Sequence, residues 1–344
     1  MNLQKNSFLC KYRTKYDSVL SLYLLTEDWK KLYNFGMKSS DEKQIVTGRF
    51  APTPSGRMHL GNIFTAMIAY LNAKSQKGRC LLRIEDLDKL RCPLSSAAEI
   101  IDDLKWFGFS FDGEIEYQSK RTSVYERETE KLEKAGLVYP CYCSRAQLHA
   151  ATAPHGETPV YDGRCRFLKK EDRPLKSPCL RVIVPDETIA FTDGIMGEYK
   201  QNLKKECGDF IIRRSDGVYA YQLAVVADDA LQNLTEVVRG RDLISSAPRQ
   251  IYLFRTLGYK PPRFLHVPLI TDANGERLSK REGKSNLEYI RSAFPSPEPV
   301  IGMLAYNAGL IEKFAPVTLN RLIDVYDVSK ISKKDIALDP CGLF

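Results

Sequence analysis

Two separate segments carry residue types suited to binding a nucleotide, and the first is a turn followed by a helix start. In residues 51–62, prolines and Gly56 predict a rigid turn between a strand and a helix that begins near His59. The free N–H groups and positive dipole end of such a helix suit phosphate, and Gly61 lets a flat ring or a ribose approach the backbone. A lone His-x-Gly pattern has a simpler alternative, in which the histidine only caps the helix or faces solvent.

The second segment, residues 276–283, combines one lysine with two arginines after a turn signal at 272–275. A loop that carries Lys280 in this setting can hold a triphosphate and neutralise the charge that grows on a leaving pyrophosphate. The alternative for any such charge run is a solvated surface. Neither segment alone identifies an activity.

Three cysteines form a possible metal site: Cys141 and Cys143 lie close together, and Cys165 follows. Thiolates favour zinc, and a structural zinc site needs a fourth protein ligand. The alternative is three reduced cysteines without a metal. The remaining cysteines are interpreted as packing or incidental thiols: Cys10, Cys80, Cys92, Cys179, Cys207 and Cys341.

The elements that must position these residues alternate between strand and helix. Residues 45–50, which are followed by Pro52 and Pro54, predict a strand, and residues 59–76 have helical periodicity. Residues 80–84 predict a second strand, and Ser95 or Ser96 is expected to cap the next helix. Strand, helix and strand in this order predict a βαβ unit, and therefore an α/β fold with a parallel sheet.

The rest of the chain is less regular. A charged helix is expected at 125–134, and a stretch rich in cysteine, glycine and proline follows from 139 to about 185. Sheet-like segments are then expected at 210–212, 223–226, 235–238 and 264–270, before a helical tail that starts near Asn286. The pattern predicts one nucleotide-binding fold interrupted by a long insertion. Residues 1–44 are an unexplained extension, and Met37 suggests a misassigned upstream start codon.

The composition is that of a soluble globular protein, with 43% hydrophobic and 27% charged residues in a chain of 344. A formal net charge of +8 favours a polyanionic partner such as nucleic acid without requiring one. Nine scattered cysteines do not fit a disulfide scaffold, so reduced thiols in the cytoplasm are expected. No stretch approaches the roughly 20 apolar residues of a membrane-spanning helix, so no membrane partner is expected.

In this order, the two nucleotide-binding segments resemble the paired signatures of class I aminoacyl-tRNA synthetases, with His-Leu-Gly-Asn at 59–62 and Arg-Leu-Ser-Lys-Arg at 277–281. Further blocks narrow the resemblance to the glutamyl group: residues 49–56, 83–88, 221–229 and 238–243. The resemblance covers roughly residues 46–335. It implies a Rossmann-like, doubly wound parallel sheet with a zinc-bearing insertion and a short helical C-terminal tail.

The same resemblance implies how the chain is divided. Residues 1–44 are the extension, and the catalytic domain is expected in two halves, at 45–122 and 222–285. Residues 123–221 are expected to form the insertion, which binds tRNA and carries the zinc. Residues 286–344 are expected to be a helical remnant without an anticodon-binding domain.

The resemblance also implies a glutamate pocket. Glutamate has two carboxylates and one ammonium, so Arg49 and Arg239 are expected to meet carboxylate through paired hydrogen bonds. Glu85 takes the ammonium and Tyr221 offers a hydroxyl. The pocket is completed by Phe50, Ala51, Pro52 and Thr53, the last of which stands where the family usually has serine. Outside these motifs, each charged or aromatic member would be interpreted as a surface ion pair or a packing residue.

ATP is assigned by resemblance to His59, Gly61, Asn62 and Lys280, together with a magnesium ion. His59 and Lys280 are the expected catalytic residues, because they can stabilise transition-state charge. Glutamate's α-carboxylate would attack the α-phosphorus of ATP, and the glutamyl adenylate would pass to a tRNA. No covalent enzyme intermediate is implied.

Two features favour one branch of the glutamyl group, the glutamyl-queuosine tRNA(Asp) synthetases. Zinc-bearing glutamyl-tRNA synthetases typically place a histidine two residues after the last cysteine, where this chain has Phe167. In the queuosine branch Tyr161 is the fourth ligand, although His155 is a conceivable substitute. The implied ligands of a structural zinc are therefore Cys141, Cys143, Tyr161 and Cys165.

The second feature is the short stretch between Lys280 and Phe344, which is too short for the anticodon-binding region of a glutamyl-tRNA synthetase. The implied acceptor is therefore the queuosine base at the wobble position of tRNA(Asp). Arg281 and residues 324–332 instead resemble ordinary glutamyl-tRNA synthetases, so a shortened enzyme that charges the 3′ end of tRNA(Glu) is the alternative. A catalytically silent tRNA- or adenylate-binding regulator is a third hypothesis, against which the intact motif residues argue.

Overall fold

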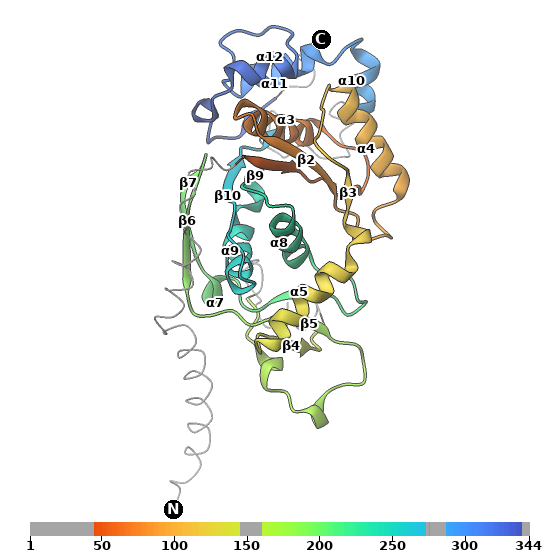
Figure 1. The fold of residues 1–344 in the computed structure, drawn as a ribbon, viewed down its shortest axis with the longest axis vertical. Helices are drawn as coiled ribbons and strands as arrows, with labels where there is room; N and C mark the ends of the chain where they lie inside the picture. Colours follow the sequence, from red (N-terminus) through yellow and green to blue (C-terminus); the bar gives the residue numbers. More distant parts are fainter. Residues whose placement is uncertain (1–44, 145–159, 273–274, 276–286, 339–344) are drawn as a thin grey trace, which may run out of the picture. The chain divides into compact units, whose positions relative to one another are not determined.

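The structure is a computed structural model that describes residues 45–144, 160–272, 275 and 287–338 (Figure 1). Lys280, His155 and residues 1–44 lie outside these ranges. The helices are α3 (Leu60–Ser75), α4 (Leu94–Trp106), α5 (Thr122–Lys134), α7 (Leu203–Glu206), α8 (Tyr221–Leu231), α9 (Ala247–Thr256), α10 (Leu287–Ala293), α11 (Glu298–Asn307) and α12 (Leu319–Val325). The strands are β1 (Thr47–Phe50), β2 (Arg79–Ile84), β3 (Glu116–Tyr117), β4 (Val138–Cys141), β5 (Cys179–Val182), β6 (Thr188–Asp193), β7 (Gly197–Asn202), β8 (Phe210–Arg213), β9 (Glu236–Gly240), β10 (Arg263–Val267), β11 (Ile270–Thr271) and β12 (Ile336–Ala337).

Parallel strands form the central layer. β1 pairs with β2 and β2 with β3, while β9 pairs with β10, all in parallel. The two groups meet at β1 and β9, where Thr235 N donates to Thr47 O at 2.9 Å. The resulting order, β3-β2-β1-β9-β10, places later strands on both sides of β1. This confirms the predicted mixed α/β fold with a parallel sheet, and it brings the carboxyl ends of all these strands to one edge.

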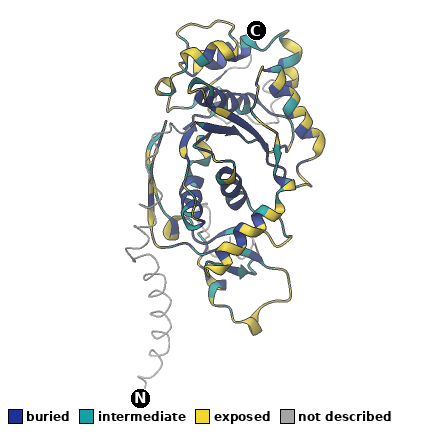
Figure 2. Cartoon of the chain, viewed as in Figure 1, coloured by how far each residue is buried: buried dark blue, intermediate teal, exposed yellow. Residues whose placement is uncertain are grey.

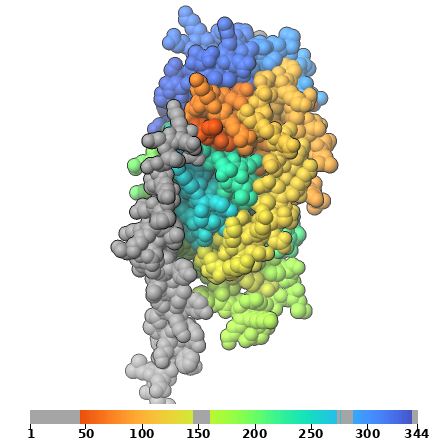
Figure 3. Space-filling model, in the orientation of Figure 1, coloured from red at the N-terminus to blue at the C-terminus, as the bar shows by residue number. Residues whose placement is uncertain are grey.

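Alternation along the strands divides the buried apolar residues between two cores. One core joins α3, α11 and α12 to these strand residues: Phe50, Cys80, Leu82, Ile84, Val238, Leu265 and Val267. The other core joins α5, α8 and α9 to Leu81, Val237 and Phe264. In Figure 2 the inner helices α3 and α8 are mostly buried, whereas α4 and α5 show exposed outer faces. Figure 3 shows side chains of α5, in yellow, beside those of α8 and α9.

Two local predictions are wrong. Residues 223–226 were expected to be sheet-like, but they belong to the helix α8. Their run of Leu-Ala-Val-Val is buried on all sides, and a short apolar run does not distinguish a buried strand from a buried helix. The helix α4 begins at Leu94 after Pro93, which takes the N-cap position, so neither Ser95 nor Ser96 is the cap.

The segment predicted as an insertion contains antiparallel strands. β5 lies between β4 and β8, and β6 pairs with β7 in a hairpin whose turn contains Gly194. The hairpin turn lies against β10, because Gly194 N donates to Phe264 O at 2.8 Å. A Cβ on Gly194 would lie 2.8 Å from the Leu265 side chain, so this close approach requires glycine.

The helices α10, α11 and α12 follow the sheet, in agreement with the expected helical tail. A short parallel pair, β11 with β12, joins the end of this tail to the segment after β10. Among the described helices, none has both the length and the hydropathy needed to cross a membrane.

Candidate active site

A cavity of about 420 Å³ lies at the carboxyl edge of the parallel sheet. It is bounded by the ends of β1, β2 and β9 and by the starts of α3 and α8, the position at which α/β sheets bind ligands. Its walls contain all predicted glutamate- and ATP-binding residues that fall within the described ranges: Arg49, Phe50, Ala51, Pro52, Thr53, His59, Gly61, Asn62, Glu85, Tyr221 and Arg239. Lys280 is outside those ranges.

The wall beside α3 is built by a capping box. His59 Nδ1 accepts from Gly61 N at 3.1 Å, and Asn62 Oδ1 accepts from His59 N at 3.0 Å. A Cβ on Gly61 would lie 2.9 Å from the imidazole, so glycine leaves room for this ring. Because Nδ1 accepts, the proton of a neutral imidazole lies on Nε2, which is then a donor. His59 therefore caps the helix, as the simpler alternative expected, and also lines the cavity.

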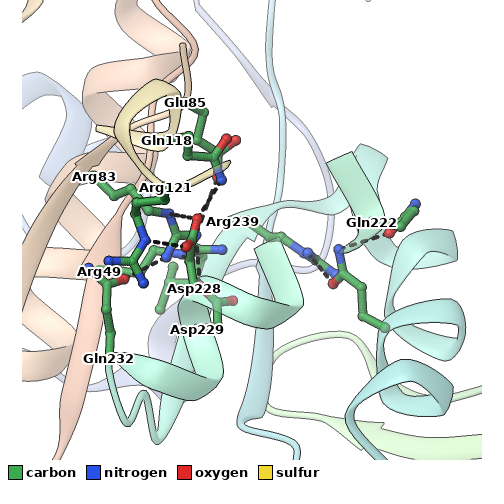
Figure 4. A network of polar contacts seen from close by, with 12 residues as sticks. Arg49, Arg83, Glu85, Gln118, Arg121, Gln222, Asp228, Asp229, Gln232 and Arg239 are labelled. Carbon is green, nitrogen blue, oxygen red and sulfur yellow. Dashed lines mark hydrogen bonds and ion pairs between the residues drawn. The ribbon is translucent and has the colours of Figure 1, made fainter. Parts of the chain in front are cut away.

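Behind the cavity, buried charges join the strand ends to α8 (Figure 4). Arg83 is fully buried and pairs with Asp229 at 2.7 Å and with Glu85 at 3.3 Å. Arg49 pairs with the same Asp229 at 3.5 Å and donates to Val238 O at 3.2 Å. Burial of charges is tolerated when they are paired in this way. The network thus holds Arg49 and Glu85 in place before any ligand binds.

The neighbouring carboxylate, Asp228, extends this network to the start of α5. It accepts hydrogen bonds from Gln118 Nε2 at 2.8 Å, Arg121 Nε at 2.6 Å and Tyr125 Oη at 2.9 Å. Asp228 itself is fully buried. Its three donors come from the chain that follows β3, so α5 and α8 are locked together beneath the cavity.

Arg239 is fixed separately, at the end of β9. Its Nε donates to His266 Nε2 at 3.0 Å, and its Nη1 donates to Gln250 Oε1 at 2.7 Å. Gln250 Nε2 in turn donates to Gln222 Oε1 at 3.0 Å. Figure 4 shows this chain of contacts running away from the carboxylates of α8. Nη2 is buried without a partner of hydrogen-bond geometry within the described residues, and Tyr221 is a neighbouring group.

The cavity also holds one acid and one phenol with shifted pKa values. Burial raises the pKa of Glu85, and the positive charges of Arg83 and Arg49 oppose that shift. Burial likewise raises the pKa of Tyr221, which therefore stays a protonated hydroxyl at neutral pH. Two guanidinium groups, one carboxyl and one hydroxyl in a single cavity can receive a small molecule that carries both carboxylate and ammonium groups.

The predicted zinc ligands also come together, in a small core outside the cavity. The Sγ atoms of Cys141, Cys143 and Cys165 all lie within 4.8 Å of one another. Tyr161 Oη lies 3.3 Å from Cys141 Sγ and 3.8 Å from Cys143 Sγ. The guanidinium of Arg181 stacks on the Tyr161 ring at 3.9 Å.

This cluster fits a tetrahedral zinc ion. Zinc–sulfur bonds of about 2.3 Å place sulfur ligands roughly 3.8 Å apart, close to the 3.6 Å between Cys143 Sγ and Cys165 Sγ. A hydrogen bond with the Cys179 thiol lowers the pKa of Cys141, in the direction that a thiolate ligand requires. Desolvation raises the pKa of Tyr161, which opposes ionisation of its hydroxyl. The donor set is therefore three thiols with one phenol beside them.

Comparisons with known proteins agree with this geometry. The family model for the catalytic domain of class I tRNA synthetases of the glutamate and glutamine type matches residues 45–309. A Symbiobacterium thermophilum protein named glutamyl-Q tRNA(Asp) synthetase is 46% identical over 311 residues, which are 86% of this chain and 96% of the relative. A Neisseria meningitidis protein of the same name is 49% identical over 240 residues, or 69% of this chain and 81% of that one.

The chain belongs to the class I tRNA synthetase family. A solved structure of the glutamate–tRNA synthetase of Elizabethkingia anophelis superposes with a TM-score of 0.76 at 26% identity, covering 87% of this chain and 69% of that one. The predicted resemblance to glutamyl-Q tRNA(Asp) synthetases and the class I catalytic fold are confirmed, and with them a ligase-type enzyme.

Several residues that support the site in this synthetase were not predicted from the sequence. Arg83 and the Asp228–Asp229 pair lie in recognised blocks, yet no role was expected of them. A signal existed, because a charged residue inside the apolar run of β2 must be buried with a partner. His266 gives the same signal in β10. Cys179, interpreted as incidental, packs in one small core with Cys141, Cys165 and Tyr161.

Proposed function

We propose that this protein activates L-glutamate with ATP and transfers the glutamyl group to the queuosine base at the wobble position of tRNA(Asp). The observation that carries the proposal is the single cavity that contains Arg49, Glu85, Tyr221 and Arg239 beside the start of α3. The names of relatives at 46% and 49% identity support the acceptor. The cavity supports the amino acid, because its charges complement those of glutamate.

In the proposed complex, the guanidinium groups of Arg49 and Arg239 bind the two carboxylates of glutamate and Glu85 binds its ammonium group. Arg49 is already oriented by Asp229 and Arg239 by His266, so little reorganisation is needed on binding. The Tyr221 hydroxyl donates a hydrogen bond to the substrate. Phe50, Ala51, Pro52 and Thr53 form the adjacent backbone wall.

For the first chemical step, an oxygen of glutamate's α-carboxylate attacks the α-phosphorus of ATP, and pyrophosphate leaves. His59, Gly61 and Asn62 hold the nucleotide at the start of α3, where Nε2–H of His59 can donate to a phosphate oxygen. We assign Lys280 to the leaving pyrophosphate, together with the magnesium ion that ATP carries. In the second step a hydroxyl of the queuosine ring attacks the glutamyl carbonyl carbon and AMP is released.

Zinc is proposed to be structural. Cys141, Cys143, Cys165 and Tyr161 would hold it with no open coordination position, which excludes a bound reactive water. We also propose that residues 123–221, which contain this cluster, form the tRNA-binding insertion between the catalytic halves at 45–122 and 222–285. Residues 286–344 would form the helical remnant beside them.

The deciding experiment is transfer of radiolabelled glutamate, with ATP, to tRNA(Asp) with and without queuosine and to tRNA(Glu). We expect label only on queuosine-containing tRNA(Asp), and we expect glutamate-dependent ATP–pyrophosphate exchange without any tRNA. Label on tRNA(Glu) alone would replace the proposed acceptor with the 3′ end of tRNA(Glu). Absence of the exchange would refute glutamate activation itself and leave the silent regulator.

A further inference from the structure

Arg239 lies in register with His266, its parallel neighbour on β10. Their side chains therefore share one face of the sheet, the face that carries Phe264 and the α8–α9 core. An arginine Nε always carries its proton, so the 3.0 Å contact with His266 Nε2 makes that ring nitrogen the acceptor. His266 must then be neutral with its proton on Nδ1.

Asp193, at the end of β6, accepts a hydrogen bond from this Nδ1–H group. Its Oδ2 lies 2.5 Å from His266 Nδ1, and both side chains are almost completely buried. Its Oδ1 accepts backbone N–H groups from Ile195 at 3.0 Å, Met196 at 2.9 Å and His266 at 3.1 Å. Oδ1 of Asp193 therefore holds the hairpin turn and the backbone of β10, and Oδ2 fixes the position of the proton on the His266 ring.

The protonation states agree with this geometry. Burial opposes the charge on Asp193, but hydrogen bonds from His266 and from backbone amides outweigh it and lower its pKa. Burial lowers the pKa of His266 despite the hydrogen bond with Asp193, so the ring is neutral at pH 7. An ionised Asp193 beside a neutral His266 is the pair that leaves Nε2 free to accept from Arg239.

We propose that Asp193 and His266 are positioning residues for the amino-acid pocket: Asp193 fixes the Nδ1–H tautomer of His266, and His266 then orients Arg239 towards a substrate carboxylate. The inference rests on the proposed glutamate-activating function. It assigns a role to the β6–β7 hairpin, which lies outside the parallel sheet but reaches the pocket through β10. Nε contacts His266, Nη1 contacts Gln250, and the guanidinium lies 5.1 Å from the Phe264 ring centre. Nη2, on the guanidinium that neighbours the Tyr221 hydroxyl, is the nitrogen that we assign to the ligand.

The test uses Asp193→Asn in the full chain. Asparagine keeps an oxygen for the three backbone N–H groups, but its amide nitrogen now faces His266 Nδ1 as a donor. The imidazole must then carry its proton on Nε2. This Nε2–H either faces Arg239 Nε–H, another donor, or donates to the Leu243 carbonyl that also neighbours the ring. A buried donor without an acceptor is costly, so we expect the KM for glutamate in pyrophosphate exchange to rise about tenfold or more. The KM for ATP should change less than about twofold.

Two further substitutions separate positioning from loss of folding. His266→Gln keeps an acceptor near the Nε2 position and should keep a KM for glutamate within a few-fold of wild type, whereas His266→Leu should match Asp193→Asn. The matched control is Asp186→Asn. Asp186 is an exposed carboxylate that contacts Asn202 on the same hairpin, and its substitution should leave both KM values unchanged. Equal effects of Asp193→Asn on the KM values of glutamate and ATP would overturn the proposal.

The tautomer can be read without any activity. The chain has four histidines, so long-range proton–nitrogen NMR with His266→Gln as the assignment control identifies the His266 signals. We expect the Nδ1–H form in wild type and the Nε2–H form in Asp193→Asn. An Nε2–H form in the wild type would overturn the proposal even if the enzyme is active. Wild type without glutamate-dependent exchange would refute the proposed function, while the NMR result would still decide whether Asp193 sets the tautomer.

Discussion

The proposed glutamate pocket and the cysteine cluster, which is the proposed zinc site, are both buried polar sites, but they are held together in different ways. In the pocket, charged side chains are held by one another: Arg83 and Arg49 share Asp229, and Arg239 is fixed by His266. In the cluster, thiols and a phenol meet at 3.3 to 3.8 Å, the distances of weak sulfur contacts. The pocket is therefore ordered before its ligand arrives, whereas the cluster would gain most of its cohesion from the proposed zinc ion.

This difference agrees with what each site is proposed to do. Recognition of a charged amino acid requires guanidinium groups that are already oriented, because reorganisation would be subtracted from binding. A structural zinc site supplies folding free energy through its metal bonds, so its ligands need only be near one another. Loss of one charge should therefore damage the pocket and the fold together. Loss of one thiol should act locally.

The largest effect is expected from Asp229→Asn. The substitution leaves Arg83, which is fully buried, and Arg49 without their shared carboxylate, and breaking a buried ion pair costs about 3–5 kcal/mol. We expect the free energy of unfolding in urea to fall by that amount. Glu187→Gln removes an exposed partner of Arg255 and should cost less than about 1 kcal/mol. Equal losses for both variants would contradict the idea that the charges hold one another.

The next effect concerns binding rather than folding. Arg239→Lys keeps the positive charge but removes the planar fork that contacts His266 and Gln250 and that is proposed to bind carboxylate. We expect the KM for glutamate in pyrophosphate exchange to rise about 10- to 100-fold with a much smaller change for ATP. Arg255→Lys, on the exposed side of α9, is the control. A larger change for ATP than for glutamate would assign Arg239 to the nucleotide.

A smaller effect is expected from pH. Burial raises the pKa of Glu85, so its proposed ammonium-binding carboxylate is protonated at a higher pH than the ~4.3 of an ordinary glutamate. As the pH falls through this raised pKa, the KM for glutamate should increase several-fold. The free energy of unfolding should increase over the same fall in pH, because the folded state then binds a proton that the unfolded state does not. This contribution to stability is lost as the pH rises through the raised pKa.

Glu85→Gln is the control for that pH dependence, because it cannot titrate. Its KM for glutamate should be high at every pH and should lack the inflection, which is measured by exchange between pH 5 and 8. A wild-type profile that is parallel to that of Glu85→Gln would show that Glu85 does not titrate between pH 5 and 8, and the pH argument would fail.

The sequence predicted the strands and helices around the pocket well, because β1, α3 and β2 have clear periodicities. Residues recognised by resemblance, such as Arg49 and Arg239, were brought into one cavity as expected. The supporting contacts were not predictable in this way, since Asp193 lies on the β6–β7 hairpin, which was not predicted from the sequence, and contacts His266 on β10. Residues 223–226 of α8 were interpreted as sheet-like because this buried apolar run carries no helical stripe.

The smallest effect on activation is expected from Cys165→Ser, and it tests the comparison most directly. None of the cluster's described residues lines the cavity, so removal of one ligand should change glutamate-dependent exchange by no more than about twofold. Metal analysis should give about one zinc per wild-type chain and at least a tenfold lower content in the variant. Cys207→Ser, a half-buried thiol outside the cluster, should keep its zinc.

Transfer to tRNA gives the sharper measurement in the same pair of variants. If the cluster orders the proposed tRNA-binding insertion, Cys165→Ser should lower transfer to queuosine-containing tRNA(Asp) while exchange is retained, because adenylate formation needs only the preordered pocket. Parallel loss of exchange and transfer would mean that the metal supports the pocket through β5 and β8, and the two sites would then be one cooperative unit. Unchanged zinc in Cys165→Ser would instead remove Cys165 from the ligand set, and the thiols would be packing residues of the β4–β5 core.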